Sequence, residues 1–334
     1  MRTRGLELAV VVLAACGDGG GGPADAPPVV DGAPDASREG LLSGTGLYAD
    51  FAARTLADGV APFAPTYALW SDGAVKSRWI ALPDGAAIDA TDLDRWIPPV
   101  GTRVWKQFAS PEGVVIETRL IERRGDDGGD DDWWFGSFVW RDDDSDAELA
   151  PDGAADVRGT HFDVPSQTDC LKCHRGQPGR LLGFTAVQLA GAGDGLRLDA
   201  LVDGGSVVPA PAAAVLGFPG DAVTAAAIGT LHASCGHCHN DHGIAWPDTR
   251  MDLNVRSDAA SAETSAVWTT TVGVGLESFV GHGPTVRIAP GDPDASAIVV
   301  RMASRVQGTA MPPLFSEIVD DAGVARVRAW IETL

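Results

Sequence analysis

The chain has 334 residues, of which 45% are hydrophobic, and its formal net charge is −21. This length accommodates roughly two or three domains, and the hydrophobic fraction supports globular cores. The strong negative charge argues against a nucleic-acid-binding surface and against docking on an anionic lipid leaflet, whereas a neutral or basic protein partner is compatible with it.

The first residues have the pattern of an export signal. Arg2 and Arg4 precede an apolar run from Leu8 to Ala15 that is too short to span a bilayer stably. The run ends in Leu-Ala-Ala-Cys, which resembles the bacterial lipobox, so Cys16 is the expected lipidation site; an ordinary signal peptide with a chance cysteine is the alternative. We predict a lipoprotein signal over residues 1–16, export to the periplasmic side of the cell envelope, and a lipid anchor, in the outer membrane, as the only membrane attachment.

A flexible linker and then a β domain are expected next. Residues 17–44 are rich in Gly, Pro, Asp and Ala, which predicts a flexible linker. Residues 45–165 hold seven of the ten tryptophans and many short alternating runs. These runs predict strands at 75–82 and 102–109, and a hairpin formed by GVVIETRLIERR and DWWFGSFVWRDD. We therefore predict an antiparallel, sandwich-like β domain over 45–165.

Two side-chain groups in this region have alternative interpretations. Tryptophans at strand period indicate core positions, although they can also form a sugar-binding platform. Nine aspartates lie between residues 126 and 146. Solvated turns are the favoured interpretation, and a calcium site is the alternative, although the spacing does not match an EF-hand loop.

The motif C-x-x-C-H occurs twice, and it is the attachment pattern of c-type haem. Two thiols at this spacing form thioethers with the vinyl groups of one porphyrin, and the adjacent imidazole ligates the iron. Chance gives about 0.002 such motifs in a chain of this composition. The motifs comprise Cys170, Cys173 and His174, and Cys235, Cys238 and His239.

Two other sites use paired cysteines. A Cys₄ zinc site built from both pairs leaves the histidine after each pair unexplained. A thioredoxin-type redox pair requires a preceding strand and a following helix, which the segments DVPSQTD and TLHAS do not suggest. We therefore predict two covalently attached c-type haems as the cofactors.

Two mainly helical haem modules are expected after the β domain, which gives an α+β multidomain fold. The first, over 166–220, contains a short predicted helix in LLGFTAVQLAG and leans on its neighbours. The second, over 221–334, begins with a helix in DAVTAAAIGTLHA that leads into its motif. A further helix is expected near Asp294 as N-cap, and the last helix has Asp320 or Asp321 as cap.

The chain from about residue 45 to 334 resembles known cytochromes. Its C-terminal third is similar to bacterial class I cytochrome c domains in the segments MDL, PGDPDASAIVVRM, MPPL and AWIETL. The preceding part, with IETRL, WWFGSFVW, PSQTDCLKCH and LGFTAVQL, resembles a family of bacterial envelope dihaem c-type cytochromes. Some relatives in that family are encoded with or fused to quinoprotein dehydrogenase-like domains, so the resemblance implies redox partner proteins of that kind.

The sixth iron ligands differ between the two predicted haems. Met311 precedes two prolines in the second module, and such a loop holds the thioether ligand of class I cytochromes c, although a methionine can also simply fill the core. No methionine lies between residues 17 and 250. The first haem therefore takes a histidine, a methionine from the C-terminal module, or no sixth ligand. His161 is the nearest spare histidine and the leading candidate.

Three functions are compatible with this pattern. The favoured one is electron transfer without a substrate of its own, from a periplasmic dehydrogenase onward, with the first haem at the lower potential. The second is a dihaem enzyme such as a peroxidase with an open first haem. The third is a carbohydrate- or partner-binding protein with accessory haems.

Overall fold

A computed structural model describes residues 40–191, 193–211 and 216–334. The predicted signal peptide with Cys16 and most of the predicted linker lie outside the described residues. No helix within the described part of the chain is long and apolar enough to cross a membrane.

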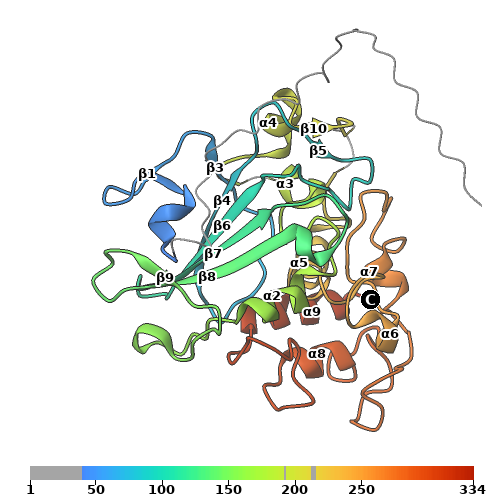
Figure 1. Ribbon diagram of the computed structural model, residues 1–334. Helices are drawn as coiled ribbons and strands as arrows, with labels where there is room; N and C mark the ends of the chain where they lie inside the picture. Colours follow the sequence, from blue (N-terminus) through green and yellow to red (C-terminus); the bar gives the residue numbers. More distant parts are fainter. Residues whose placement is uncertain (1–39, 192, 212–215) are drawn as a thin grey trace, which may run out of the picture. The chain divides into compact units, whose positions relative to one another are not determined.

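The main element is a six-stranded antiparallel sheet with strand order β3-β4-β6-β7-β8-β9 (Figure 1). The structure confirms the strands predicted at 75–82 and 102–109 and the predicted hairpin. These segments form strands because alternating β-branched and aromatic residues favour a pleated sheet. The bounds are Val60–Pro62 (β3), Val75–Ala81 (β4), Arg103–Ala109 (β6), Val115–Arg123 (β7), Trp133–Trp140 (β8) and Ala147–Leu149 (β9).

One face of this sheet carries Trp105, Leu120 and Phe138, all fully buried. It packs on a short 3₁₀ helix at Leu42–Thr45 and on the ribbon of β1 (Tyr48–Asp50) and β2 (Thr55–Leu56). The expected two-sheet sandwich was wrong: the described residues form one large sheet and two two-stranded ribbons. The second ribbon pairs β5 (Ile88–Asp89) with β10 (Val207–Val208) in parallel.

The acidic turn between β7 and β8 is more ordered than solvated aspartates would be. It contains a 3₁₀ helix at Asp130–Asp132. The buried Asp132 carboxylate accepts hydrogen bonds from the backbone N–H groups of Asp127, Gly128 and Gly129. Asp130 forms ion pairs with two arginines that follow the first C-x-x-C-H motif. These two aspartates therefore fix the turn and attach it to the motif.

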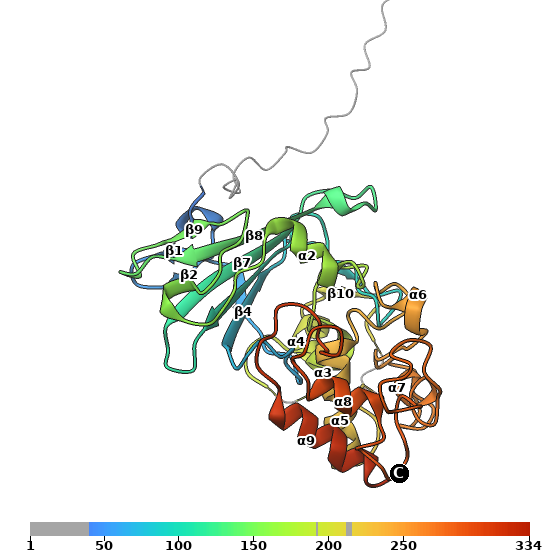
Figure 2. The same cartoon turned by 90° about the horizontal axis from the view of Figure 1, so that it is seen from below.

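The described residues of the segment 166–220 form no core separate from the sheet. Its helices are α2 (Gln167–His174), α3 (Ala186–Ala190) and α4 (Leu198–Asp203). Side chains of α3 and α4 share one apolar cluster with β4, β6 and Trp96. The helix α2 lies against β8 (Figures 1 and 2).

Residues 221–334 form a helical part with its own apolar cluster, centred on Ile228, Val327 and Trp330. The helices α5 and α9 pack side by side (Figure 2). Asp221 caps α5 by accepting from Thr224 N–H, and Asp320 caps α9 by accepting from Gly323 N–H, at 2.8 Å each. The helices are α5 (Ala222–Cys235), α6 (Trp246–Thr249), α7 (Ala266–Thr269), α8 (Ala297–Met302) and α9 (Asp321–Ile331).

The expected cap at Asp294 was wrong. The N-cap of α8 is Ser296, two residues later. Its hydroxyl donates to the Asp292 carbonyl and accepts from the Ala289 N–H, while Asp294 pairs with Arg328 of α9. The fold of the described residues is thus α+β, with a mainly antiparallel sheet followed by helices.

Candidate functional site

The first motif lies on α2, and local hydrogen bonds set the position of this helix. Ser166 and Asp169 form a capping box at its N-terminus. The Gln167 amide donates to the Phe135 carbonyl on β8 at 2.6 Å. These contacts attach the helix that carries Cys170, Cys173 and His174 to the edge of the sheet.

The His174 imidazole has the arrangement of a metal ligand. Its Nδ1 lies 2.5 Å from the Arg180 carbonyl oxygen, so Nδ1 carries the proton and Nε2 keeps its lone pair. Burial lowers the pKa of His174 to about 4. The ring is therefore neutral at physiological pH, which is the form that binds iron.

A cavity of about 770 Å³ adjoins the first motif. One wall is the face of the sheet opposite to Trp105. The other is α2 and the chain after it. The apolar lining includes Phe63, Val104, Ile121, Phe135, Leu181, Leu182 and Phe184.

The second motif follows the C-terminal end of α5. His239 is buried, and its Nδ1 lies 3.4 Å from the Thr249 hydroxyl oxygen. Its carbonyl accepts from Leu253 N–H at 2.8 Å, which holds the turn against the core. Burial lowers the pKa of His239 to about 4, so this imidazole is also neutral.

A second cavity, of about 590 Å³, adjoins Cys235 and His239. Met251, Met302 and Met311 all line it, so its lining alone does not single out Met311. Two arginines, Arg287 and Arg301, also line it. Met311 is fixed through its backbone: its N–H donates to the Arg301 carbonyl at 3.1 Å, and its carbonyl accepts from Arg305 at 3.2 Å.

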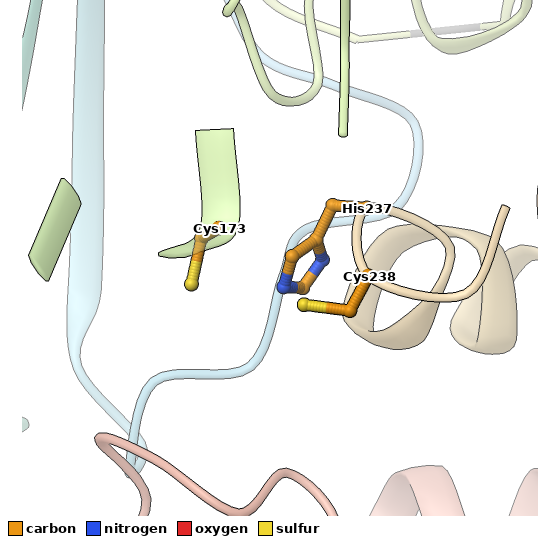
Figure 3. Close-up of side chains that lie close together, drawn as sticks. All are labelled: Cys173, His237 and Cys238. Carbon is orange, nitrogen blue, oxygen red and sulfur yellow. The ribbon is translucent and has the colours of Figure 1, made fainter. Parts of the chain in front are cut away.

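The two motifs meet at Cys173 and Cys238 (Figure 3). Their sulfur atoms and a ring nitrogen of His237 lie within 4.8 Å of one another. The Cys238 thiol also donates to the Lys172 carbonyl over 3.8 Å. A Cβ added at Gly176, just after the first motif, would collide with the His237 carbonyl. The contact between the motifs therefore depends on a glycine.

This junction borders a further cavity. A cavity of about 1,320 Å³ reaches both motifs and the loop that contains Met311. A Cys₄ site is not assembled, because among the described residues Cys170 and Cys235 do not join the other two thiols within 4.8 Å. What the structure brings together is three potential ligands, Cys173, His237 and Cys238.

The spare histidines lie at different distances from these sites. His161 is exposed, contacts Phe162 with the two rings tilted and their centroids 4.2 Å apart, and lines the large cavity with Cys173 and His174. It does not line the smaller cavity beside the first motif. The ring of His232 accepts from Val255 N–H at 3.0 Å, and His242 and His282 are exposed.

Two features of the site were missed in the sequence. Asp72, which is 8% exposed, accepts hydrogen bonds from Ser316 and from the N–H groups of Glu317 and Ile318, and so holds the loop after Met311. Basic residues on β4, β6 and β7 face the first cavity. For the second feature, the alternation within each strand separates its two faces but does not give the register between the strands.

No protein-family model, curated protein or solved structure matches this chain. The resemblance to envelope dihaem cytochromes therefore stays a prediction, and the site has to be interpreted from its own geometry.

Proposed function

We propose that this chain is a dihaem c-type cytochrome that transfers electrons in the bacterial cell envelope, anchored through Cys16. The observation that carries the proposal is that each C-x-x-C-H motif adjoins its own largely apolar cavity, and that the two motifs touch at Cys173 and Cys238. A carrier with two adjacent attachment sites can pass an electron over a short path inside one chain.

The residues present fit the chemistry of haem attachment. Cys170 and Cys173 would hold one haem, and Cys235 and Cys238 the other, as thioethers. Neutral His174 and His239 would be the proximal ligands, and Met311 the sixth ligand of the second iron. Haem supplies a one-electron iron couple, and the apolar cavity walls supply the low-dielectric surroundings that tune it.

The partner follows from charge and from the family resemblance. A chain with a net charge of −21 favours a neutral or basic protein surface as its docking partner. A periplasmic dehydrogenase, of the quinoprotein class implied by the resemblance, is the proposed electron donor. Seven tryptophans between residues 45 and 165 are buried or half-buried, which favours a structural role over an exposed sugar platform.

One observation supports a dihaem enzyme as the second candidate. Among the described residues that line the cavity beside the first motif, His174 is the only histidine and there is no methionine. An iron held there would keep an open position unless a residue of the larger cavity, such as His161, reaches it. Open coordination is what a peroxidase needs.

Exposure of the protein to carbon monoxide and peroxide separates the two candidates. The carrier predicts two one-electron steps in a redox titration, slow or no carbon monoxide binding by the reduced protein, and no peroxide turnover. Rapid carbon monoxide binding at the first haem together with peroxide turnover would replace the carrier by the enzyme.

A further inference from the structure

The sheet face that borders the first cavity carries a row of cations. The register places Arg78 of β4 directly opposite Lys106 of β6, and Lys106 directly opposite Arg119 of β7. Side chains directly opposite one another in an antiparallel pair have Cβ atoms roughly 4.5–5.5 Å apart on the same face. All three side chains line the cavity beside Cys170, Cys173 and His174.

Such a row is unfavourable without an anion, because like charges directly opposite one another destabilise a sheet. Among the described residues, a close acidic partner is found for one of the three cations. Glu117, which is 2% exposed, accepts two hydrogen bonds from Arg119, at 2.9 and 2.5 Å. Arg119 is thereby neutralised.

Arg78 and Lys106 lack such a partner. Neither side chain forms a hydrogen bond or an ion pair with another residue in the described part of the chain; the Lys106 ammonium lies 4.7 Å from the centroid of the Phe108 ring. Arg78 is only 7% exposed. Burial, with the neighbouring cations, holds the pKa of Lys106 well below its usual range, and burial lowers the pKa of Arg78 to about 10.

Asp169 is the acidic residue among the described residues that line this cavity, and its carboxylate is already engaged. Asp169 pairs with Lys172 at 2.6 Å and accepts from Ser166 at the start of α2. Two cations therefore face the cavity beside the first motif, and its described lining residues supply no free carboxylate to meet them. A buried cation of this kind is stabilised when an anion enters the site.

We propose that Arg78 and Lys106 bind the propionate carboxylates of the haem attached through Cys170 and Cys173. A haem carries two propionates, and the cavity offers two unpartnered cations on adjacent strands, one of them an arginine suited to bidentate contact with a carboxylate. The inference rests on the proposed function, and it gives the sheet a role as one wall of the first haem site.

The consequence is electrostatic. A cation next to a haem disfavours the ferric form, which carries one more positive charge than the ferrous form, so Arg78 and Lys106 raise the potential of the first haem. Histidine or open coordination lowers the potential of the first haem, and the two cations oppose this lowering. The difference in potential between the two haems is therefore smaller than the iron ligands alone would give.

The test is a redox titration of the full-length, matured protein and of Lys106→Met and Arg78→Met. Each substitution should lower the reduction potential of the first haem by about 59 mV. For one electron, this corresponds to a tenfold shift of the equilibrium toward the ferric form. Lys106→Arg keeps the charge and should keep the potential. Where Lys106→Met does not mature, Lys106→Gln is titrated in its place.

Arg103→Met is the matched control, because Arg103 lies on the same strand as Lys106 but on the opposite face of the sheet, where it donates to the Thr45 carbonyl. It should leave the first potential unchanged. If Lys106→Met and Arg78→Met each carry two haems by mass and the potential of the first haem is unchanged in both, this inference is wrong while the proposed function stands. Carbon monoxide binding gained only by Lys106→Met would also overturn it, because Lys106 would then be an iron ligand. Absence of covalent haem in the unsubstituted protein would instead remove the proposed function.

Discussion

At the scale of single residues, the choice of a sixth ligand for the proposed second haem iron falls among three methionines. Met251, Met302 and Met311 all line the second cavity. Met302 is 7% exposed on α8 and belongs to the apolar cluster of the helical part, whereas Met311 lies in the loop that also borders the junction of the motifs. The position of Met311 between both cavities makes it the best candidate.

Met311→Ala should abolish the near-infrared sulfur-to-iron charge-transfer band of the oxidised protein, because that band requires a thioether bound to ferric iron. Met302→Leu and Met251→Leu are the matched controls and should retain the band. If the band survives in Met311→Ala and disappears in one of the controls, that other methionine is the ligand.

His232 predicts how stability depends on pH. Burial lowers its pKa from 6.5 to about 4 in the folded protein. Below pH 6.5 the unfolded chain binds a proton that the folded chain does not, so stability falls as the pH drops from 6.5 to 4. One pKa unit corresponds to about 1.4 kcal/mol, so the loss from this group is at most about 3 kcal/mol.

His232→Gln should therefore flatten the decline of the unfolding free energy between pH 6.5 and 4, as measured by urea titration at several pH values. Gln keeps an oxygen that can accept from Val255 N–H, which preserves the local contact. His242→Gln, at a side chain that is 49% exposed, is the control and should leave the slope unchanged. An equal slope in His232→Gln and in the unsubstituted protein would contradict the assignment.

At the scale of elements, the loop that contains Met311 is held from outside its own module. Asp72 follows β3 in the chain, and it binds three donors at Ser316, Glu317 and Ile318. Trp70 adds to this contact by donating from its indole N–H to the Ile318 carbonyl at 3.0 Å. The sheet region thus takes part in positioning the predicted thioether ligand.

Asp72→Ala should lower the free energy of unfolding by about 1–3 kcal/mol, because the Ser316 hydroxyl and the N–H groups of Glu317 and Ile318 lose a charged acceptor. It should also raise the fraction of molecules that lack the methionine–iron band on warming. Asp152→Ala, at an exposed turn position, is the control. A destabilisation in which the band keeps its temperature dependence would mean that Asp72 has only a structural role.

Local sequence patterns predict several of the elements but not how the sheet is covered. Strands at 75–82 and 102–109, the hairpin, and the helices before Cys235 and after Asp320 follow from local periodicity and capping, and they are confirmed. The sandwich was wrong because alternation predicts that a strand has two different faces but not what covers them. A polar face over a cofactor cavity has the same period of two as a polar face in water.

The remaining features of the site are contacts between residues far apart in the chain, which local sequence patterns do not predict. Arg78, Lys106 and Arg119 become neighbours only through the register of three strands. Asp72 meets Ser316 across 244 positions of the chain. Neither contact leaves a local signal, whereas each C-x-x-C-H motif carries its chemistry within five residues.

At the scale of the whole molecule, the central claim is that one chain carries two covalent haems at adjoining sites. The measurement that tests it most directly is the intact mass of the denatured mature protein, compared with Cys170→Ala/Cys173→Ala and Cys235→Ala/Cys238→Ala. The account predicts the mass of the chain plus two haems, and plus one haem in each double variant. A mass equal to that of the chain alone, or of the chain plus one haem, in the unsubstituted protein would contradict it.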